Sequence, residues 1–166
     1  MSETERPEVN LYTDGACLGN PGPGGWAYIL YHPASGKAVE ASAGEARTTN
    51  NRMELTAVIE GLEALGRPSR VRLIGDSQYV LKGLTEWMPG WKKRGWRKSD
   101  KKPVQNADLW KQIDELIEKH EVEAGWTRGH NGHKENEECD RMANAEAQKL
   151  SEGGGAGSGS TSPDDD

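Results

Sequence analysis

The order of apolar and polar positions in the first part of the chain predicts three β-strands. Residues 8–14, "EVNLYTD", alternate apolar and polar side chains, as a half-buried strand does. A turn rich in Gly and Pro follows at 15–25, and two more strands are expected at 26–32 and 37–45. The short connection "PASG" between the last two strands predicts a hairpin, which makes them antiparallel neighbours.

The rest of the chain predicts alternating helices and strands. A helical period runs from Thr48 to Leu65 and stops at the Gly and Pro of 66–68. Later segments are expected in this order: a strand at 69–76, a short helix at 77–84 with Ser77 as N-cap, an irregular stretch at 85–103, a helix at 106–120, a strand at 121–127, a loop at 128–133 and a helix at 134–150. Hairpin strands followed by crossovers predict an α/β fold, a five-stranded mixed sheet with helices on both faces.

One carboxylate interrupts the apolar stripe of the helix at 48–65. At about 100° per residue, Glu54 lies in line with the apolar residues Val58, Leu62 and Leu65. The opposite, polar face is formed by Arg52, Thr56, Glu60 and Glu63. A carboxylate on a buried face is unfavourable unless it is hydrogen-bonded, protonated, paired or bound to a metal. Because Asn50 or Asn51 can cap the helix, capping does not explain Glu54, which needs a partner elsewhere in the fold.

Three further carboxylates are candidates for the same site. Asp14 closes the first strand, Asp76 closes the fourth, and Asp140 flanks the apolar stripe of the last helix. If the first and fourth strands are neighbours, Asp14 and Asp76 lie close together, and clustered carboxylates repel unless a cation is present. Oxygen ligands select hard cations such as Mg²⁺ or Mn²⁺. The alternative is that each Asp at a strand end is a turn residue and that Asp140 is a solvated helix residue.

The net charge of −6 is distributed unevenly along the chain. Residues 9–150 hold 20 acidic and 20 basic side chains, so the acidic surplus lies at the two ends. We expect residues 1–7 and the Gly/Ser-rich, acidic tail 151–166 to be disordered, which leaves one domain at 8–150. No apolar run approaches the length of a membrane span and no leader is recognisable, so a cytoplasmic protein without membrane contact is expected.

A basic and aromatic segment stands out within the domain. Residues 86–102 contain seven basic and two acidic side chains, a charge of +5, interleaved with Trp87, Trp91 and Trp96. Tryptophan rings can pack on sugars and bases while Lys and Arg meet phosphates, which favours binding to a polyanion. The alternative is a solvated segment whose tryptophans reach the core.

The histidines and cysteines offer further chemistry. In the loop "GHNGH", His130 or His133 can transfer a proton near neutral pH, or the loop is simply a surface turn. Zinc is not expected, because Cys17 and Cys139 are not spaced as ligands with these histidines. Since the cysteines lie near Asp14 and Asp140 in the sequence, a disulfide that responds to oxidation is one hypothesis and two buried free thiols are the other.

Six motifs taken together resemble the type 1 ribonuclease H family in its bacterial form. They run in order from about Val9 to Ala147: "YTDGACLGNPGPGGWA", "RTTNNRMEL", "GDSQYV", "WKKRGW", "DKKPVQNADLW" and "GHNGHKENEECDRMA". The resemblance implies a ribonuclease H-like fold at 8–150, with 86–102 as its basic protrusion. It also implies endonucleolytic hydrolysis of the RNA strand of RNA–DNA hybrids by two Mg²⁺ ions, with Mn²⁺ as a substitute, to give 5′-phosphate and 3′-hydroxyl ends.

The resemblance also implies roles for individual residues. The family's metal-binding catalytic carboxylates correspond to Asp14, Glu54, Asp76 and Asp140. His130 corresponds to a loop histidine that assists proton transfer or product release, whereas His133 is expected to be structural. Contacts to the RNA in the minor groove are implied for Asn20, Asn50 and Gln78, and contacts near a DNA-strand phosphate for Arg47 and Thr49. The DNA-strand channel is implied for Trp87, Trp91, Lys92, Lys93 and Arg94.

The sequence departs from the family pattern in places, and two other functions remain open. Gly75 stands where the family often has Thr, and the family's separate N-terminal hybrid-binding domain is not found, which puts processivity in doubt.

A non-catalytic hybrid-binding module is one alternative function, and a nuclease or polynucleotidyl transferase acting on DNA is the other. A monomer is expected.

Overall fold

A five-stranded sheet forms the centre of the computed structural model, which describes residues 6–75, 77–126 and 133–157 of the chain. The strands are β1 Glu8–Cys17, β2 Gly22–His32, β3 Lys37–Thr48, β4 Arg70–Gly75 and β5 Glu121–Trp126. Their order across the sheet is β3-β2-β1-β4-β5. The first three strands are antiparallel neighbours, β4 runs parallel to β1, and β5 runs parallel to β4. The predicted mixed sheet is therefore confirmed.

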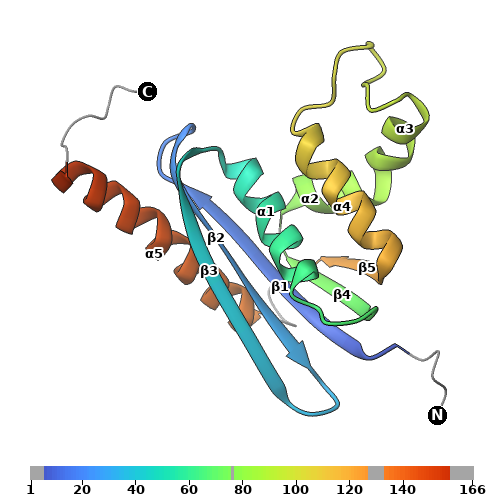
Figure 1. The fold of residues 1–166 in the computed structure, drawn as a ribbon, viewed down its shortest axis with the longest axis horizontal. Helices are drawn as coiled ribbons and strands as arrows, with labels where there is room; N and C mark the ends of the chain where they lie inside the picture. Colours follow the sequence, from blue (N-terminus) through green and yellow to red (C-terminus); the bar gives the residue numbers. More distant parts are fainter. Residues whose placement is uncertain (1–5, 76, 127–132, 158–166) are drawn as a thin grey trace.

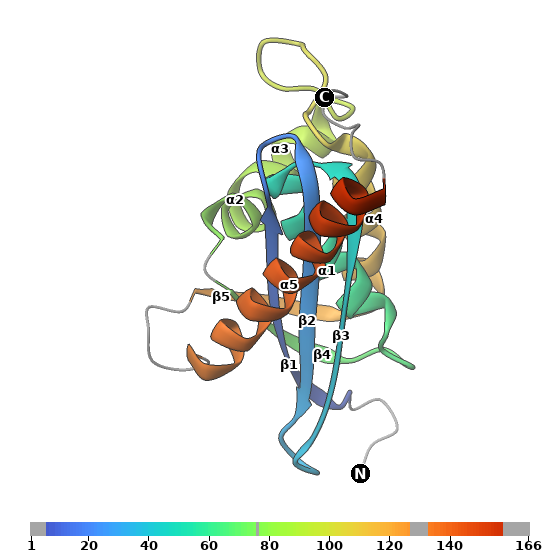
Figure 2. The same ribbon diagram turned by 90° about the vertical axis from the view of Figure 1, so that its left-hand side faces the viewer.

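Helices cover both faces of this sheet, as predicted (Figure 1). Helices α1 Asn50–Glu63 and α4 Ala107–Lys119 lie on one face. Helix α5 His133–Gly157 crosses the other face over β1, β2 and β3, which Figure 2 shows from the side of α5. Between β4 and α4 the chain forms α2 Gln78–Lys82, the π-helical turn η1 Gly83–Trp87 and α3 Met88–Lys93. No helix in the described ranges is long and apolar enough to cross a membrane.

Several boundaries differ from those expected from the sequence. The stretch 85–103 is helical up to Lys93, since the π-helical turn η1 runs directly into α3, with Pro89 in the first turn of α3. Strands β1 and β2 extend into the Gly- and Pro-rich turn at 15–25, since each pairs with its neighbour there. Helix α5 continues seven residues beyond its expected end at 150, through a run of glycines that disfavours helix.

Two apolar layers separate the sheet from its helices. On the side of α1 and α4, Leu11, Leu55 and Trp110 are completely buried and belong to the larger core. On the side of α5 a smaller core contains Tyr12 and Cys139. Adjacent residues of β1 thus point to opposite faces, as the pleat of a strand requires. Side chains of β1 with even residue numbers face α5, and those with odd residue numbers face α1.

Glycine allows α5 to lie close to the sheet. A Cβ atom built on Gly25 of β2 would overlap the carbonyl oxygen of Ala143, and one built on Gly44 of β3 would lie 2.8 Å from Leu150 Cδ1. Near the same place, Ser42 Oγ donates a hydrogen bond of 2.8 Å to Glu146 Oε2. These contacts fix how far α5 stands from the strands that it crosses.

Candidate active site

The carboxyl end of β1 packs tightly against the first turn of α1. A Cβ atom on Gly15 would overlap the backbone nitrogen of Glu54 and would lie 2.8 Å from Met53 Cβ. Asp14 directly precedes Gly15, and its Oδ1 accepts a hydrogen bond of 2.8 Å from the Gly15 N–H. The strand end that carries Asp14 therefore lies beside the helical turn that carries Glu54.

Helix α5 meets β1 two residues before Asp14. The Cys139 thiol donates a 3.5 Å hydrogen bond to the carbonyl oxygen of Tyr12. Burial, followed by the charge of Asp14, raises the pKa of Cys139 well above its usual range. Asp140 follows Cys139 and is exposed, with its Oδ1 accepting a 3.2 Å hydrogen bond from Asn144 Nδ2.

Strand β4 reaches the same region. Ile74 pairs with Tyr12 in the parallel ladder, and Asp14 and Asp76 each stand two residues further along the sequence. The side chain of Asn136 on α5 donates from Nδ2 to the Ile74 carbonyl at 3.4 Å, a contact that sequence reasoning did not anticipate. Asp76 itself lies outside the described residues.

Glu54 is buried, with 8% of its surface exposed, as its position in the apolar stripe predicts. Within the described ranges, which do not include Asp76, no three His, Cys, Asp or Glu side chains are grouped so as to hold a metal ion. The carboxylates of Asp14, Glu54 and Asp140 offer only oxygen, the donor type that Mg²⁺ and Mn²⁺ prefer. The donor chemistry therefore fits a hard divalent cation.

The start of α1 is tied to the loop between β1 and β2. The Asn50 N–H donates a 2.9 Å hydrogen bond to Asn20 Oδ1, so two of the predicted RNA contacts lie side by side. The N-cap is Thr49, whose Oγ1 accepts from the Arg52 N–H at 3.2 Å, and not Asn50 or Asn51 as the sequence suggested. Asn50 is the first residue of the helix, and its N–H, which has no partner within the helix, donates to Asn20.

The remaining predicted contacts to the hybrid lie at element ends. Arg47 is exposed near the end of β3, one residue before Thr48. Gln78 is exposed at the start of α2, where Ser77 caps the helix as predicted by accepting from the Val80 N–H at 3.2 Å. His130 lies outside the described residues, and His133 begins α5.

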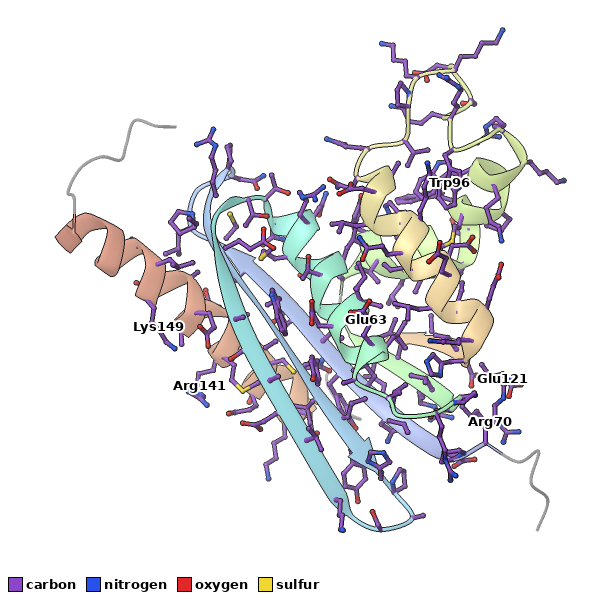
Figure 3. The ribbon with its side chains drawn as sticks, viewed as in Figure 1. Glu63, Arg70, Trp96, Glu121, Arg141 and Lys149 are labelled. Carbon is purple, nitrogen blue, oxygen red and sulfur yellow. The ribbon has the colours of Figure 1, made fainter. Side chains whose placement is uncertain are left out.

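The basic protrusion, residues 86–102, is built on a row of aromatic rings. The ring of Trp91 lies between those of Trp87 and Trp110, with centroids 5.9 and 5.3 Å away, and Trp96 follows at 6.4 Å. Trp110 is completely buried, whereas Trp87 is exposed over 37% of its surface. The rings therefore reach the core at one end and solvent at the other, and binding of a polyanion by this segment stays a prediction. Figure 3 shows Trp96 in the protrusion, on the opposite side of the molecule from Arg141 and Lys149 of α5.

The cations of the protrusion are not equivalent. Lys92 Nζ forms an ion pair of 2.9 Å with Asp114 Oδ1 on α4, and this hydrogen-bonded contact raises the pKa of Lys92. Lys93 is exposed, and Arg94 Nε donates to the Arg97 carbonyl at 3.0 Å. A hollow of about 380 Å³ opens beside them, lined by Tyr79, Trp87, Trp91, Arg94, Lys98, Ser99 and Gln105. The ion pair with Asp114 engages Lys92 within the fold, which the sequence did not indicate.

The hypothesis of a disulfide between Cys17 and Cys139 is wrong. Both thiols are free. Cys17 lies at an odd position of β1 and donates to the carbonyls of Thr48 at 3.3 Å and Gly22 at 3.5 Å, whereas Cys139 packs on the face covered by α5. The two thiols are separated by the sheet, and only Cys139 is fully buried.

The sheet order, the helices on both faces and the carboxylates beside the end of the central strand define an α/β protein with a ribonuclease H-like fold. The RNase H family model matches residues 6–148. Ribonuclease H of Cupriavidus necator is 57% identical over 143 residues, covering 86% of this chain and 97% of that protein. Ribonuclease H of Phenylobacterium zucineum is 57% identical over 153 residues, covering 90% and 99%. The chain therefore belongs to the RNase H family, whose members are hydrolases.

Solved structures agree with this assignment. The crystal structure of LC9-RNase H1, a type 1 RNase H, superposes with a TM-score of 0.76 at 36% identity, covering 90% of this chain and 76% of that chain. LC11-RNase H1, solved in complex with an RNA/DNA hybrid, superposes with a TM-score of 0.66 at 23% identity, covering 85% and 97%, and shows the same fold.

Proposed function

We propose that this protein hydrolyses the RNA strand of RNA–DNA hybrids as an endonuclease, leaving 5′-phosphate and 3′-hydroxyl ends. The observation that carries the proposal is the packing of Gly15 against the backbone of Glu54, which sets the end of β1 beside the first turn of α1. The contact of Cys139 with Tyr12 brings the start of α5 to the same strand end and supports the inclusion of Asp140. Relatives named ribonuclease H at 57% identity support the activity.

We assign the metal ligands as Asp14, Glu54, Asp76 and Asp140, with Mg²⁺ as the ion and Mn²⁺ as a substitute. These four carboxylates would hold the cations, which would supply activation of the attacking water and stabilisation of the leaving oxygen of the phosphodiester. The position of Glu54 supports this assignment, because its helical turn lies beside the strand end that carries Asp14. His130 is proposed to move a proton or to assist product release, in keeping with an imidazole that titrates near neutral pH.

Selection of the RNA strand is proposed to depend on the amides of Asn20, Asn50 and Gln78. Only RNA has 2′-hydroxyl groups, which both donate and accept hydrogen bonds. The Oδ1 atom of Asn20 already accepts from the Asn50 N–H, so the Nδ2 donors of Asn20 are the atoms we assign to the RNA. The amides of Asn20, on the loop between β1 and β2, and of Asn50, on α1, can then both hydrogen-bond to 2′-hydroxyl groups of the RNA strand.

The DNA strand is proposed to lie against a second set of residues. Arg47 and Thr49 are assigned to one of its phosphates, and the channel is assigned to Trp87, Trp91, Lys92, Lys93 and Arg94. Exposed Lys and Arg side chains bind phosphates without reading sequence, so we propose cleavage with little sequence preference and a strong dependence on salt. Because Lys92 is paired with Asp114, we propose that it shapes the channel and that Lys93 contacts the phosphate directly.

We further propose that residues 8–150 form the catalytic domain. A monomer is also proposed. A cytoplasmic location is proposed because the two cysteines are free thiols, as is usual in a reducing compartment.

The proposal is tested by offering three duplexes side by side, an RNA–DNA hybrid, duplex RNA and duplex DNA, each labelled on one strand at a time. We expect cleavage of the RNA strand of the hybrid alone, in Mg²⁺ and not in EDTA. Cleavage of DNA would favour a DNA nuclease on the same fold. Tight hybrid binding without cleavage in any divalent cation would favour a binding module.

A further inference from the structure

Arg52, which the helical period places on the polar face of α1, joins that helix to the start of α4. Its Nη1 donates to Asp108 Oδ1 at 3.1 Å and its Nη2 donates to Asp108 Oδ2 at 2.8 Å, a bidentate pair. Nη1 also donates to Asn106 Oδ1 at 3.1 Å. The hydrogen bonds of this pair lower the pKa of Asp108 and raise that of Arg52. One guanidinium thus fixes two side chains that lie more than fifty residues away in the sequence.

Asn106 continues the connection towards the protrusion. Its backbone is left-handed, with φ of 60°, which Asn tolerates better than most residues, and its side chain does not cap α4. Instead, Asn106 Nδ2 donates to the Tyr79 hydroxyl at 3.1 Å, and Trp110 Nε1 donates to the same oxygen at 3.1 Å. The Tyr79 ring lies 6.1 Å from that of Trp87. A continuous network therefore runs from α1 through α4 and α2 to the exposed tryptophan.

Each end of the network adjoins a residue that we assign to the hybrid. The Arg52 N–H is held by the N-cap Thr49, and Tyr79 directly follows Gln78. We propose that Arg52, held by Asp108 and Asn106, is a positioning residue that fixes the first turn of α1 and the protrusion at one spacing, so that both strands of a hybrid are gripped together. This inference rests on the proposed function and concerns how the substrate is held, not the chemical step.

The charge of Asp108 distinguishes a positioning role for Arg52 from a simpler role in which Arg52 is only a cation that binds the substrate. Its side chain is 61% exposed on the side of the molecule assigned to a polyanion, and an acid there repels phosphates. If Arg52 served only as a cation for the substrate, Asp108 would weaken binding by neutralising it. If Arg52 is a positioning residue, Asp108 strengthens binding by holding the guanidinium in place. The two roles therefore predict opposite signs for the loss of Asp108.

The test is Asp108→Ala, with Glu115→Ala as the matched control. Glu115 is exposed on the same helix and carries the same charge. Hybrid affinity is measured by fluorescence anisotropy in EDTA, and KM and kcat by cleavage of the labelled hybrid in Mg²⁺. We expect Asp108→Ala to raise the Kd and KM about fivefold with kcat unchanged, and Glu115→Ala to leave all three at the wild-type value. An unchanged or lower Kd in Asp108→Ala would overturn the inference.

A second variant keeps the test decisive if Asp108→Ala unfolds. Arg52→Lys retains the positive charge but cannot bind both oxygens of Asp108 and Asn106 at once. We expect it to raise the Kd with an unchanged dependence on salt, whereas wild-type affinity would contradict a positioning role. Failure of wild-type protein to bind or cleave a hybrid would sink the proposed function itself. A wild type that cleaves, beside variants that bind normally, would sink only this inference.

Discussion

Gly15 of β1 lies so close to α1 that any side chain there would collide with the backbone nitrogen of Glu54. This contact sets the separation between the strand end that carries Asp14 and the helical turn that carries Glu54. The spacing of two proposed metal ligands thus depends on a residue that has no functional group of its own.

The first prediction concerns this contact. Gly15→Ala forces the backbones apart, so we expect unfolding to become easier by about 1–3 kcal/mol and metal-dependent cleavage to fall. The control is Gly66→Ala, because a Cβ atom at Gly66 meets nothing within 4 Å. Urea unfolding and the cleavage assay measure both effects. Wild-type stability and activity in Gly15→Ala would show that the contact does not set the geometry.

The second prediction concerns the buried carboxylate. Glu54→Gln keeps the shape of the side chain and removes its charge, so we expect α1 to persist and Mg²⁺-dependent cleavage to be lost. The variant is expected to be more stable than wild type in EDTA, because it removes one charge from a repelling cluster. Thermal unfolding with and without Mg²⁺ gives the second readout, since a cation that binds the folded state raises the Tm of the wild type. An equal rise in Glu54→Gln would count against Glu54 as a ligand.

The third prediction concerns pH. His120 is buried, with 5% of its surface exposed, and its Nδ1 accepts a 3.0 Å hydrogen bond from the Ser69 N–H. Burial, followed by the nearby charges of Lys119 and Arg6, lowers the pKa of His120 below its usual value of 6.5. The folded state therefore favours the neutral imidazole. Its contribution to stability is complete above pH 6.5 and is lost as the pH falls towards the lowered pKa.

Urea unfolding between pH 5 and 8 checks this dependence on His120. We expect the free energy of unfolding to decrease below about pH 6.5, and His120→Asn to be less stable at neutral pH with a flatter profile. His32→Asn changes a histidine whose side chain is not buried and should keep the wild-type profile. A profile that is unchanged in His120→Asn would assign the pH effect to other groups.

The fourth prediction separates two neighbouring lysines. Lys92 is held by Asp114, whereas Lys93 is exposed, so only Lys93 is expected to contact phosphate directly. Lys93→Ala should reduce the slope of log affinity against log salt concentration by about 0.9, the value for the counterions that one phosphate contact releases. Lys92→Ala should leave that slope unchanged and lower the Tm instead. Equal changes of slope in both variants would contradict this distinction.

Sequence patterns predicted most of the fold because they act within one element. Alternation and helical period located the five strands, α1, α4 and α5, and they identified Glu54 as a carboxylate on a buried face. The same patterns failed at 85–93, which was expected to be irregular and is helical in the structure.

The contacts that sequence did not reveal all join distant segments. The Arg52–Asp108 and Lys92–Asp114 pairs depend on which elements become neighbours in the folded chain, and so does the hydrogen bond from the Asn50 N–H to Asn20. The cysteines illustrate the same limit. Cys17 and Cys139 both stand near proposed ligands in sequence, yet the sheet separates them.

The central claim is that the carboxylates beside the end of β1 cut the RNA strand of a hybrid with the help of a divalent cation. The most direct measurement compares wild-type protein with Asp14→Asn on a hybrid labelled in its RNA strand, in Mg²⁺, with hybrid binding in EDTA as the check on folding. We predict RNA-strand cleavage by the wild type, and no cleavage but retained binding by Asp14→Asn. Full cleavage by Asp14→Asn would contradict the account.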